Sequence, residues 1–359
     1  MTIALRTPQP ARHPEPTVRA SALAHLVFER PDLDRAAAFL LDFGLVVAHR
    51  TEHTLYLRGA APSHYAYRVE RGPRARFVGA GYLVDARSDL ERLAQIDGAG
   101  PVTSSEHPGR GAMVRLRDPS GFIVEVVAEQ DEPARLSQRA PMDLGNVGNA
   151  RRRVNATQRL PIEPAALLRL GHHVIEVSEY QATCAWYTRH LGLVPSDVQV
   201  FEDGSPAVTF LRLDRGATPT DHHTLAMAQG VMPAFGHAAF EVLDADAVGM
   251  GHRVLREKAW AHAWGIGRHL LGSQIFDYWE DPWGARHEHY CDGDLFTADQ
   301  PLGVHAVSRE GMAQWGPPMP RSFTKPRLSP SSLLAIARNV SRSDDLSLGK
   351  LATLARLFG

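Results

Sequence analysis

The stretch LGHHVIEVSE, residues 170–179, repeats the pattern of AHLVFERPD, residues 24–32. A second pair of stretches agrees with the first. DPWGARHE, residues 281–288, matches DPSGFIVE, residues 118–125, and in both the Glu comes seven residues after the Asp. In each half, strand-like stretches alternate with stretches whose apolar residues have helical spacing. An internal repeat of this length determines the architecture, so the chain is predicted to consist of two similar halves.

Each half is itself predicted to contain two copies of a unit with one strand, one helix and three further strands. The first half shows this arrangement, with helices that begin near Leu33 and Ser88. Its expected strands cover residues 24–29, 54–57, 64–69, 80–84, 112–116 and 122–128. The predicted fold class is therefore α+β, with four βαβββ modules in two domains.

Shifts in composition divide the chain further. Residues 131–161 are polar, rich in Arg and Asn and without a clear period, as expected of a connection between domains. Prolines at 317, 318, 320 and 326 indicate an extended segment, which precedes two stretches with helical spacing, 331–340 and 348–358. The predicted parts are a flexible arm (1–20), an N-terminal domain (21–130), a linker (131–168), a C-terminal domain (169–295) and an extension with helices (296–359).

The composition excludes several classes of protein. With 359 residues, 44% of them hydrophobic and 22% charged, the chain has the size and composition of a globular protein of two domains. A formal net charge of -1 argues against an extended phosphate-binding face, so nucleic acid is not an expected partner. No apolar run reaches the roughly 18 residues of a membrane span, and the N-terminus lacks the apolar core of a secretion signal. Two cysteines cannot form a disulfide framework, so we expect a cytoplasmic protein.

The chain has 18 histidines, and histidine is the commonest metal ligand in proteins. His172 and His237 begin corresponding strands of the two modules in the second half, and Glu288 lies in the last strand. Each of these residues alone would ordinarily be a surface or core residue. Together, at equivalent positions of repeated units, they match the two-histidine, one-carboxylate set that holds non-haem Fe(II) and leaves positions open for substrate and dioxygen.

Other titratable side chains are expected near this set. His223 is the second histidine of the strand HHTLAMA, in which it is predicted to share one face with Leu225 and Met227. His269 and Tyr278 lie in the stretch GRHLLGSQIFDYWEDP. A histidine and a tyrosine beside a metal-bound phenol could move and orient protons, because a histidine pKa lies near neutrality. The alternative is a polar rim without a role in the reaction.

Five ordered segments of the second half resemble the type I extradiol ring-cleavage dioxygenases of the vicinal oxygen chelate superfamily, which cleave catechols such as 2,3-dihydroxybiphenyl. The segments are GHHVIEV, HHTLAMA, FGHAAFEVLDADAVG, GRH and IFDYWEDPWGARHEHY, spread over residues 170–294, and the first half matches as the weaker repeat. The resemblance implies the glyoxalase/bleomycin-resistance/dioxygenase fold. It also implies an enzyme of aromatic catabolism that opens a catechol ring with dioxygen to a semialdehyde or keto acid.

The resemblance implies a metal and its ligands. The family's iron ligands fall on His172, His237 and Glu288, and His172 is preferred to His173 because it keeps the family's offset to Val177. The implied cofactor is Fe(II), with Mn(II) as the alternative. The implied partners are a catechol-type substrate, dioxygen and further copies of the chain in a homo-oligomer.

The resemblance further implies residues that handle protons. The family's proton-handling histidine falls on His223, which is preferred to His222 because it directly precedes Thr224. The family's active-site tyrosine falls on Tyr278, and a further pocket histidine falls on His269. His223 is therefore expected to take a proton from the catechol and return it during cleavage, with a hydrogen bond from Tyr278 assisting.

The first half carries a degenerate copy of the site. It keeps His25, Glu125 and His64 at matching positions, but Gly79 stands at the position of His237. With one ligand missing, a metal there should bind weakly or not at all. The N-terminal domain is therefore expected to be metal-free, and the C-terminal domain to be catalytic with one site per chain.

Three other functions fit the same architecture. A 4-hydroxyphenylpyruvate dioxygenase-like Fe(II) oxygenase shares the two halves and the triad, but the HHT strand and the segment around Tyr278 match the catechol enzymes better. A glyoxalase-like isomerase usually needs a fourth protein ligand, and a non-catalytic ligand-binding protein would need no triad. The tryptophans of the second half suit either an aromatic substrate or ordinary packing. Those considered are Trp260, Trp264, Trp279 and Trp283.

Overall fold

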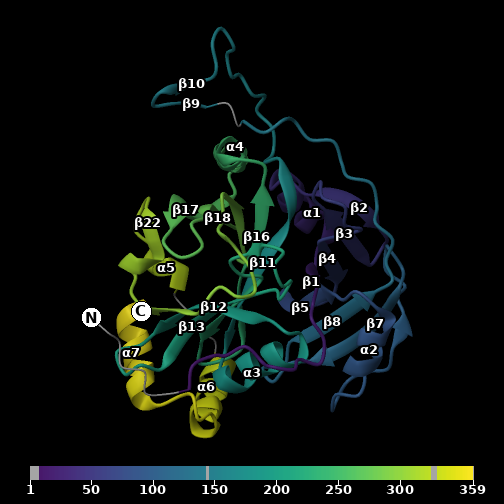
Figure 1. Cartoon of the computed structure of the whole chain (residues 1–359), viewed down its shortest axis with the longest axis vertical. Coiled ribbons are helices and arrows are strands. Elements are labelled where there is room, and N and C mark those ends of the chain that lie inside the picture. The colour runs from purple at the N-terminus through teal and green to yellow at the C-terminus, as the bar shows by residue number, and fades with distance from the viewer. Residues whose placement is uncertain (1–7, 143–144, 325–329, 359) are drawn as a thin grey trace.

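The computed structural model of the chain describes residues 8–142, 145–324 and 330–358 (Figure 1). Two large sheets dominate the structure, and each is formed by one half of the chain. The helices that connect the strands lie against these sheets, and the last helices of the chain lie beside the second sheet.

The first sheet has eight strands. In their order across the sheet they are β2 (Val46–Arg50), β3 (Thr54–Arg58), β4 (Tyr67–Arg71), β1 (Ala22–Arg30), β5 (Arg76–Leu83), β8 (Ile123–Ala128), β7 (Ala112–Arg117) and β6 (Thr103–Ser104). Helix α1 (Leu33–Asp42) follows β1, and α2 (Arg87–Leu93) follows β5. The side chain of Asp32 caps α1 by accepting a hydrogen bond from the backbone N–H of Arg35.

The second sheet has ten strands. In their order across the sheet they are β21 (Gly303–Ala306), β12 (Val194–Val200), β13 (Pro206–Arg212), β15 (Leu225–Gln229), β11 (Leu167–Val177), β16 (Ala234–Val242), β19 (Arg286–Cys291), β18 (Ile275–Glu280), β17 (Ala261–His269) and β22 (Ala313–Trp315). Helix α3 (Tyr180–His190) follows β11, and α4 (Ala245–Glu257) follows β16. Two short ribbons pair β9 (Asn146–Val147) with β10 (Ala150–Arg151) and β14 (Thr220–Asp221) with β20 (Leu295–Phe296).

The strand pairing confirms the four βαβββ modules. At the centre of each sheet the first strands of two modules run antiparallel, β1 beside β5 and β11 beside β16. The last strand of each module runs parallel to its first strand, as in β4 beside β1 and β19 beside β16. A parallel pair needs a crossover connection, which the helix and the two intervening strands of each module supply. The predicted α+β class and the internal duplication are therefore both confirmed.

The two halves are packed together through a shared apolar core that draws residues from both sheets. Buried polar contacts also join them. The guanidinium of Arg30 in β1 lies 2.8 Å from the carboxylate of Asp281, and both side chains are buried. The hydroxyl of Tyr67 in β4 lies 3.0 Å from Nε2 of His287 in β19. Burial of paired groups at this boundary fixes one sheet relative to the other.

The N-terminal segment is not a free arm over residues 8–20. Arg12 and Arg19 both pair with the carboxylate of Asp214 in the second half, at 2.6 and 2.9 Å. The prediction of flexibility was wrong here because the partner is distant in sequence, and composition alone does not reveal such a contact. Residues 1–7 of the predicted arm lie outside the described residues.

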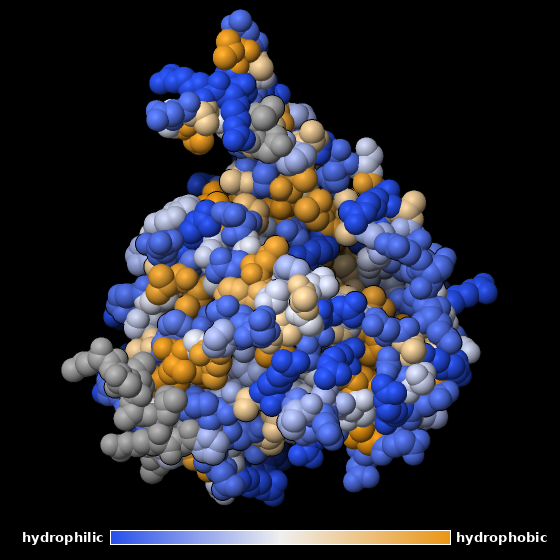
Figure 2. All heavy atoms as spheres, in the orientation of Figure 1, coloured by the Kyte–Doolittle hydropathy of each residue, from blue (hydrophilic) through white to orange (hydrophobic). Residues whose placement is uncertain are grey.

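The connection between the sheets first follows the first half and then projects from the body (Figure 1). Near its start, the backbone N–H of Leu136 donates a hydrogen bond to the carbonyl of Ala60. The ribbon of β9 and β10 lies in the projecting part, which Figure 2 shows as a narrow extension with mostly hydrophilic side chains. Val147 and Val154 in this part are 66% and 72% exposed, so the segment contributes little to the core.

The C-terminal extension is built onto the second half. Its elements are β21, β22, the 3-10 helix η1 (Glu310–Met312), α5 (Arg321–Thr324), α6 (Pro330–Arg342) and α7 (Leu348–Phe358), and the last two agree with the predicted helical stretches. Beyond α6, the hydroxyl of Ser343 donates to the carbonyl of Ser178 at 2.7 Å. Pro326 of the predicted extended segment lies outside the described residues. Within the described ranges, the helices are too short or too polar to span a membrane.

Candidate metal centre

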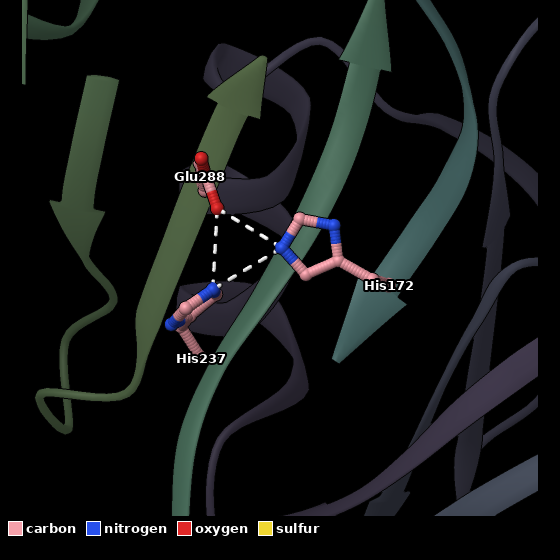
Figure 3. Close-up of side chains that lie close together, drawn as sticks. All are labelled: His172, His237 and Glu288. Atoms are coloured by element: carbon pink, nitrogen blue, oxygen red, sulfur yellow. Dashed lines mark hydrogen bonds and ion pairs between the residues drawn. The ribbon is translucent and has the colours of Figure 1, made fainter. Parts of the chain in front are cut away.

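Three adjacent strands of the second sheet place His172, His237 and Glu288 on one face. In the antiparallel pair of β11 and β16, His172 lies opposite Ala239, and Val174 lies opposite His237. In the parallel pair of β16 and β19, Ala239 lies beside Glu288. Because alternate residues of a strand share a face, the three side chains point toward one another, as Figure 3 shows.

The three candidate ligand atoms form a nearly equilateral triangle (Figure 3). Nε2 of His172 lies 3.3 Å from Nε2 of His237, and Oε2 of Glu288 lies 3.3 and 3.2 Å from these two atoms. Adjacent ligands of one metal ion are separated by about 3 Å when each bond is about 2.1 Å. Both carboxylate oxygens of Glu288 are buried without a hydrogen-bond partner among the described residues, which is rare unless another group pairs with them. The residues therefore fit a divalent cation, and the donor set is that of a non-haem Fe(II) site.

The electrostatics of the triangle favour the ligand forms of these groups. Burial opposes ionisation of Glu288, but the neighbouring histidines outweigh it and hold its pKa well below the usual range. Burial lowers the pKa of His237 to about 4. At neutral pH the site thus presents a carboxylate and a neutral imidazole, which are the protonation states that bind a metal.

His173, the histidine that follows His172 in the sequence, faces away from this triangle. The ring of His173 lies 6.1 Å from that of Phe77 and 6.2 Å from that of Tyr82, at the boundary with the first half. Burial lowers the pKa of His173 to about 3. The geometry thus agrees with the choice of His172, because successive residues of a strand point to opposite faces.

His223 lies beside the triangle, with its ring centroid 4.0 Å from that of His172. The chain bends at residues 222 and 224, just before β15, and this bend turns the imidazole toward the candidate ligands. Leu225 and Met227 belong to the apolar core instead. The prediction that these two residues share a face with His223 was therefore wrong, because strict alternation requires a regular strand through all three positions.

Tyr278 and His269 flank the triangle on the side of β18 and β17, across it from His223. Tyr278 lies directly opposite Glu288 in the antiparallel pair of β18 and β19. Nδ1 of His269 lies 2.8 Å from the carbonyl oxygen of Met312, and its Nε2 lies 2.8 Å from the hydroxyl of Tyr278. A carbonyl only accepts, so a neutral His269 carries its proton on Nδ1 and accepts from the tyrosine hydroxyl on Nε2. The structure thus brings all six predicted site residues into one cluster.

Aromatic side chains and the C-terminal extension close one side of the cluster. Trp264 in β17 is stacked nearly parallel to Tyr278, with ring centroids 5.7 Å apart. Phe323 in α5 packs against both rings at 5.3 and 5.0 Å, and the indole N–H of Trp264 donates to the carbonyl of Pro317. Of the tryptophans considered from the sequence, Trp264 adjoins the candidate site, whereas Trp279 is fully buried in the main core.

A cavity of about 730 Å³ lies elsewhere, between the two halves of the chain. Its walls include His25 and Tyr65 from the first half and Arg169, Gly171 and Thr224 from the second. None of the six candidate residues lines it. The cavity is therefore separate from the candidate metal centre.

The first sheet contains the counterparts of the three ligand positions. His25 and Glu125 both lie beside Gly81 in the strand register, and Gly79 stands two residues earlier at the third position. A Cβ atom on Gly79 would lie 1.8 Å from the carbonyl oxygen of Ile123. No third ligand fits there without a shift of the backbone.

An arginine neutralises the carboxylate that remains. The two terminal nitrogens of Arg68, in β4, lie 3.0 and 2.9 Å from the two carboxylate oxygens of Glu125, and Nε2 of His25 lies 2.8 Å from one of them. All three side chains are buried. Burial opposes ionisation of Glu125, but its bonds to His25 and Arg68 hold its pKa far below the usual range. A bound guanidinium already supplies the positive charge, which supports the expectation of a metal-free first domain.

His64 does not join this buried group. Strand β4 begins at Tyr67 and not at residue 64, and the register places Tyr65 at the position of His223. The imidazole of His64 lies 3.0 Å from the carboxylate of Asp131. The sequence match was off by one residue here, and a shift of one residue moves a strand side chain to the other face.

Replacement of Arg68 by Met is expected to lower the free energy of unfolding by about 3 kcal/mol, because it removes the buried cation of Glu125 and leaves that carboxylate only the half-exposed Arg115, 2.7 Å from one oxygen. Urea denaturation followed by circular dichroism measures the loss. Arg87→Met is the matched control, since Arg87 is about half exposed and pairs with Glu91 and Glu129 at the surface. That variant should lose less than about 1 kcal/mol. Equal effects of the two substitutions would contradict the assigned role of Arg68.

The structure adds contacts that were not predicted from the sequence. Arg68 and Asp197 are buried charged residues within strands. Asp197 lies in the stretch LVPSDVQV, and a charged residue in a stretch with strand-like apolar spacing indicates a buried ion pair or a functional site. Met312 acts through its backbone carbonyl, which every residue type has. No sequence signal could have found that contact.

Comparison with known proteins agrees with the geometry. The sequence model of the Glyoxalase/Bleomycin resistance protein/Dioxygenase superfamily matches residues 169–288. Metapyrocatechase 2 of Cupriavidus necator is 31% identical over 325 residues, which cover 89% of this chain and 96% of that protein. The manganese-dependent 2,3-dihydroxybiphenyl 1,2-dioxygenase of Geobacillus genomosp. 3 is 24% identical over 318 residues, which cover 84% of this chain and 96% of that protein.

A solved structure shares the fold. Homoprotocatechuate 2,3-dioxygenase from Arthrobacter globiformis superposes with a TM-score of 0.72 at 22% identity, over 88% of this chain and 94% of that one. The similarity of sequence and the similarity of fold both extend along nearly the whole chain and include both sheets. The chain thus belongs to the extradiol dioxygenases, the ring-cleaving oxidoreductases of the glyoxalase/bleomycin resistance protein/dioxygenase superfamily.

Proposed function

We propose that the chain is an Fe(II)-dependent dioxygenase of aromatic catabolism that opens the ring of a substituted catechol to a semialdehyde or keto acid. The observation that carries this proposal is the buried triangle of His172, His237 and Glu288. The names of the two relatives support a catechol as substrate, and the manganese dependence of one of them makes Mn(II) the alternative metal. When bound, Fe(II) would hold a catecholate beside dioxygen and conduct electrons between them.

The charge of the triangle suits an anionic substrate. Glu288 contributes one negative charge, whereas His237 is neutral near pH 7 because burial lowers its pKa to about 4. With Glu288 as the one charged ligand, the site would leave a net positive charge on a divalent cation held there. Such a site favours the ionised form of a catechol hydroxyl over the neutral form.

His223 is proposed as the base that takes a catechol proton. Burial and the adjacent His172 hold its pKa well below the usual value, so at neutral pH the imidazole is uncharged and has a lone pair to offer. Its ring lies against His172, within reach of a substrate bound at the triangle. A base at this place can accept the proton and later return it to a departing oxygen.

Tyr278 and His269 are proposed as a second unit that holds a proton, on the opposite side of the triangle. Burial raises the pKa of Tyr278 well above its usual value, so the phenol stays protonated and acts as a hydrogen-bond donor. The carbonyl of Met312 fixes the orientation of His269, which in turn accepts from Tyr278. This unit would orient the substrate, while Trp264 and Phe323 beside it restrict access of water.

Anaerobic loading followed by an oxygen-uptake assay tests the proposal. The metal-free chain is titrated with Fe(II) or Mn(II), freed of excess metal and mixed with a panel of substituted catechols in aerated buffer. We expect one metal ion per chain, consumption of one dioxygen per catechol, and a yellow ring-opened product. The Fe(II) form should be the more active one.

The same assay separates the competing functions. 4-Hydroxyphenylpyruvate in place of a catechol tests for the related oxygenase, and a hemithioacetal tests for an isomerase. Full metal loading without oxygen uptake on any catechol would overturn the proposed reaction. Higher turnover with Mn(II) than with Fe(II) would overturn the proposed metal alone.

A further inference from the structure

His223 begins a row of three buried side chains that are linked by hydrogen bonds and lead away from the candidate site. Nδ1 of His223 lies 3.0 Å from Nδ1 of His222, and Nε2 of His222 lies 2.7 Å from a carboxylate oxygen of Asp197 in β12. All three residues are at most 9% exposed. The predicted base is thus connected, through a second histidine, to a buried carboxylate that the proposed reaction does not otherwise use.

The two residues behind His223 are held firmly in place. The ring of His222 lies between those of Phe210 and Phe296, with centroids 5.4 and 5.3 Å away. The second carboxylate oxygen of Asp197 lies 2.8 Å from Nε2 of His305, in the neighbouring strand β21. Neither side chain can turn without the loss of buried contacts.

The hydrogen bonds determine which ring nitrogen carries the proton. Burial opposes ionisation of Asp197, but its bonds to His222 and His305 outweigh it and hold its pKa below the usual value. An ionised carboxylate only accepts, so Nε2 of His222 donates to it. Nδ1 of a neutral His222 then has the lone pair and accepts from Nδ1–H of His223. The free lone pair of His223 is consequently on Nε2, for which no hydrogen-bond partner is found among the described residues.

We propose that Asp197 and His222 are positioning residues that keep the proton of His223 on Nδ1 and thereby present its Nε2 lone pair to a hydroxyl of the bound substrate. This inference rests on the proposed function for its catalytic consequence, but not for the placement of the proton. In the step concerned, the O–H bond of the hydroxyl breaks and an N–H bond forms on Nε2, without a change of oxidation state. The wrong tautomer would present N–H to the hydroxyl and could not accept its proton.

Asp197→Asn tests the proposal with little change of shape. The amide can donate N–H to Nε2 of His222, which reverses both hydrogen bonds and moves the proton of His223 to Nε2. We expect kcat to fall by about 100-fold or more, KM to change by less than about threefold, and one metal ion per chain to remain. Asp197→Glu, which restores the acceptor, should recover part of kcat. His222→Phe keeps a ring between Phe210 and Phe296, and it should lower kcat to a similar extent.

Nitrogen-15 NMR of histidine-labelled protein reads the tautomer without any turnover. The signal of His223, identified by its loss in His223→Gln, should show the proton on Nδ1 in the wild type and on Nε2 in Asp197→Asn. The reverse assignment in the wild type would overturn the proposal, and so would kcat within about threefold of wild type in both Asp197→Asn and His222→Phe. If the wild type cleaves no catechol, the proposed function fails, and the NMR signal still decides the tautomer.

The chain offers a matched control in Asp277 of β18. Its buried carboxylate also binds two histidines, His252 at 3.0 Å and His262 at 2.8 Å, but this group does not reach His223. Asp277→Asn should reduce stability while kcat stays within about threefold of wild type and the signal of His223 stays unchanged. An equal loss of kcat in this variant would assign the effect of Asp197 to stability and overturn its positioning role.

Discussion

Replacement of Glu288 by Ala is expected to abolish metal binding and ring cleavage together. The substitution removes the negatively charged member of the triangle and leaves two imidazoles whose nitrogens lie 3.3 Å apart. Loss of a residue that only hydrogen-bonds to a metal ligand lowers metal affinity roughly 10–100-fold. The loss of a ligand itself should lower the affinity further. Metal analysis after gel filtration should find less than about one tenth of the wild-type content. Oxygen uptake with catechols should be undetectable.

Thermal unfolding gives a second readout of the same loss. A metal that binds the native state stabilises it by about 2.7 kcal/mol at a concentration 100 times its Kd. Added Fe(II) should therefore raise the melting temperature of the wild type and leave that of Glu288→Ala unchanged. Retention of one metal ion per chain in the variant would show that the cation binds elsewhere.

The first sheet supplies the control for this experiment. Glu125 occupies the equivalent strand position but binds Arg68 and His25. Glu125→Gln is expected to reduce stability and to keep both the metal content and the activity of the wild type. Loss of metal from this variant would contradict the assignment of one metal site per chain to the second sheet.

Replacement of His223 by Gln is expected to keep the metal and to lose turnover. General acid–base catalysis typically contributes about 10²–10⁴-fold, so kcat should fall by that factor. Metal content should stay at the wild-type level, because the ring of His223 lies beside His172 but is not one of the three convergent ligands. Steady-state kinetics on one catechol, together with metal analysis of the same sample, measure both quantities. Loss of metal from this variant would overturn the assigned role.

His64→Gln is the matched control for His223. His64 lies just before β4 in the first half, and its imidazole binds Asp131 away from the triangle. We expect kcat and KM within about twofold of wild type. A large loss of kcat in this variant would show that a His→Gln substitution away from the triangle also impairs turnover. The effect of His223→Gln could then not be assigned to the loss of a base at the site.

The sequence was sufficient to predict those features of the fold and of the candidate site that depend on residue type and regular spacing. The duplicated strand and helix pattern predicted four modules, and the pairing of β1 with β5 and of β11 with β16 confirmed them. The same repeat put His172, His237 and Glu288 at equivalent strand positions. A strand has a period of two residues and a sheet brings neighbours to within about 5 Å, so equivalent positions on adjacent strands must meet.

Sequence reasoning failed where the chain departs from regular spacing. The bend before β15 turns His223 to the opposite face from Leu225, and a one-residue offset puts Tyr65 rather than His64 at its counterpart position. The packing of residues 8–20 against the second half was also not predicted. Each of these outcomes depends on a local bend or on a partner far away in the chain, and periodicity carries no information about either.

The sequence by itself determined the duplicated fold, the set of candidate metal ligands and the three side chains proposed to handle protons beside them. The tertiary structure alone decided that Arg68 neutralises Glu125 in the first sheet, that the carbonyl of Met312 orients His269, and that Asp197 stands behind His222. The physical reason is the same in each case. A buried charge or ring nitrogen must find a partner, and that partner comes from whichever strand or carbonyl the folded chain places within about 3 Å of it.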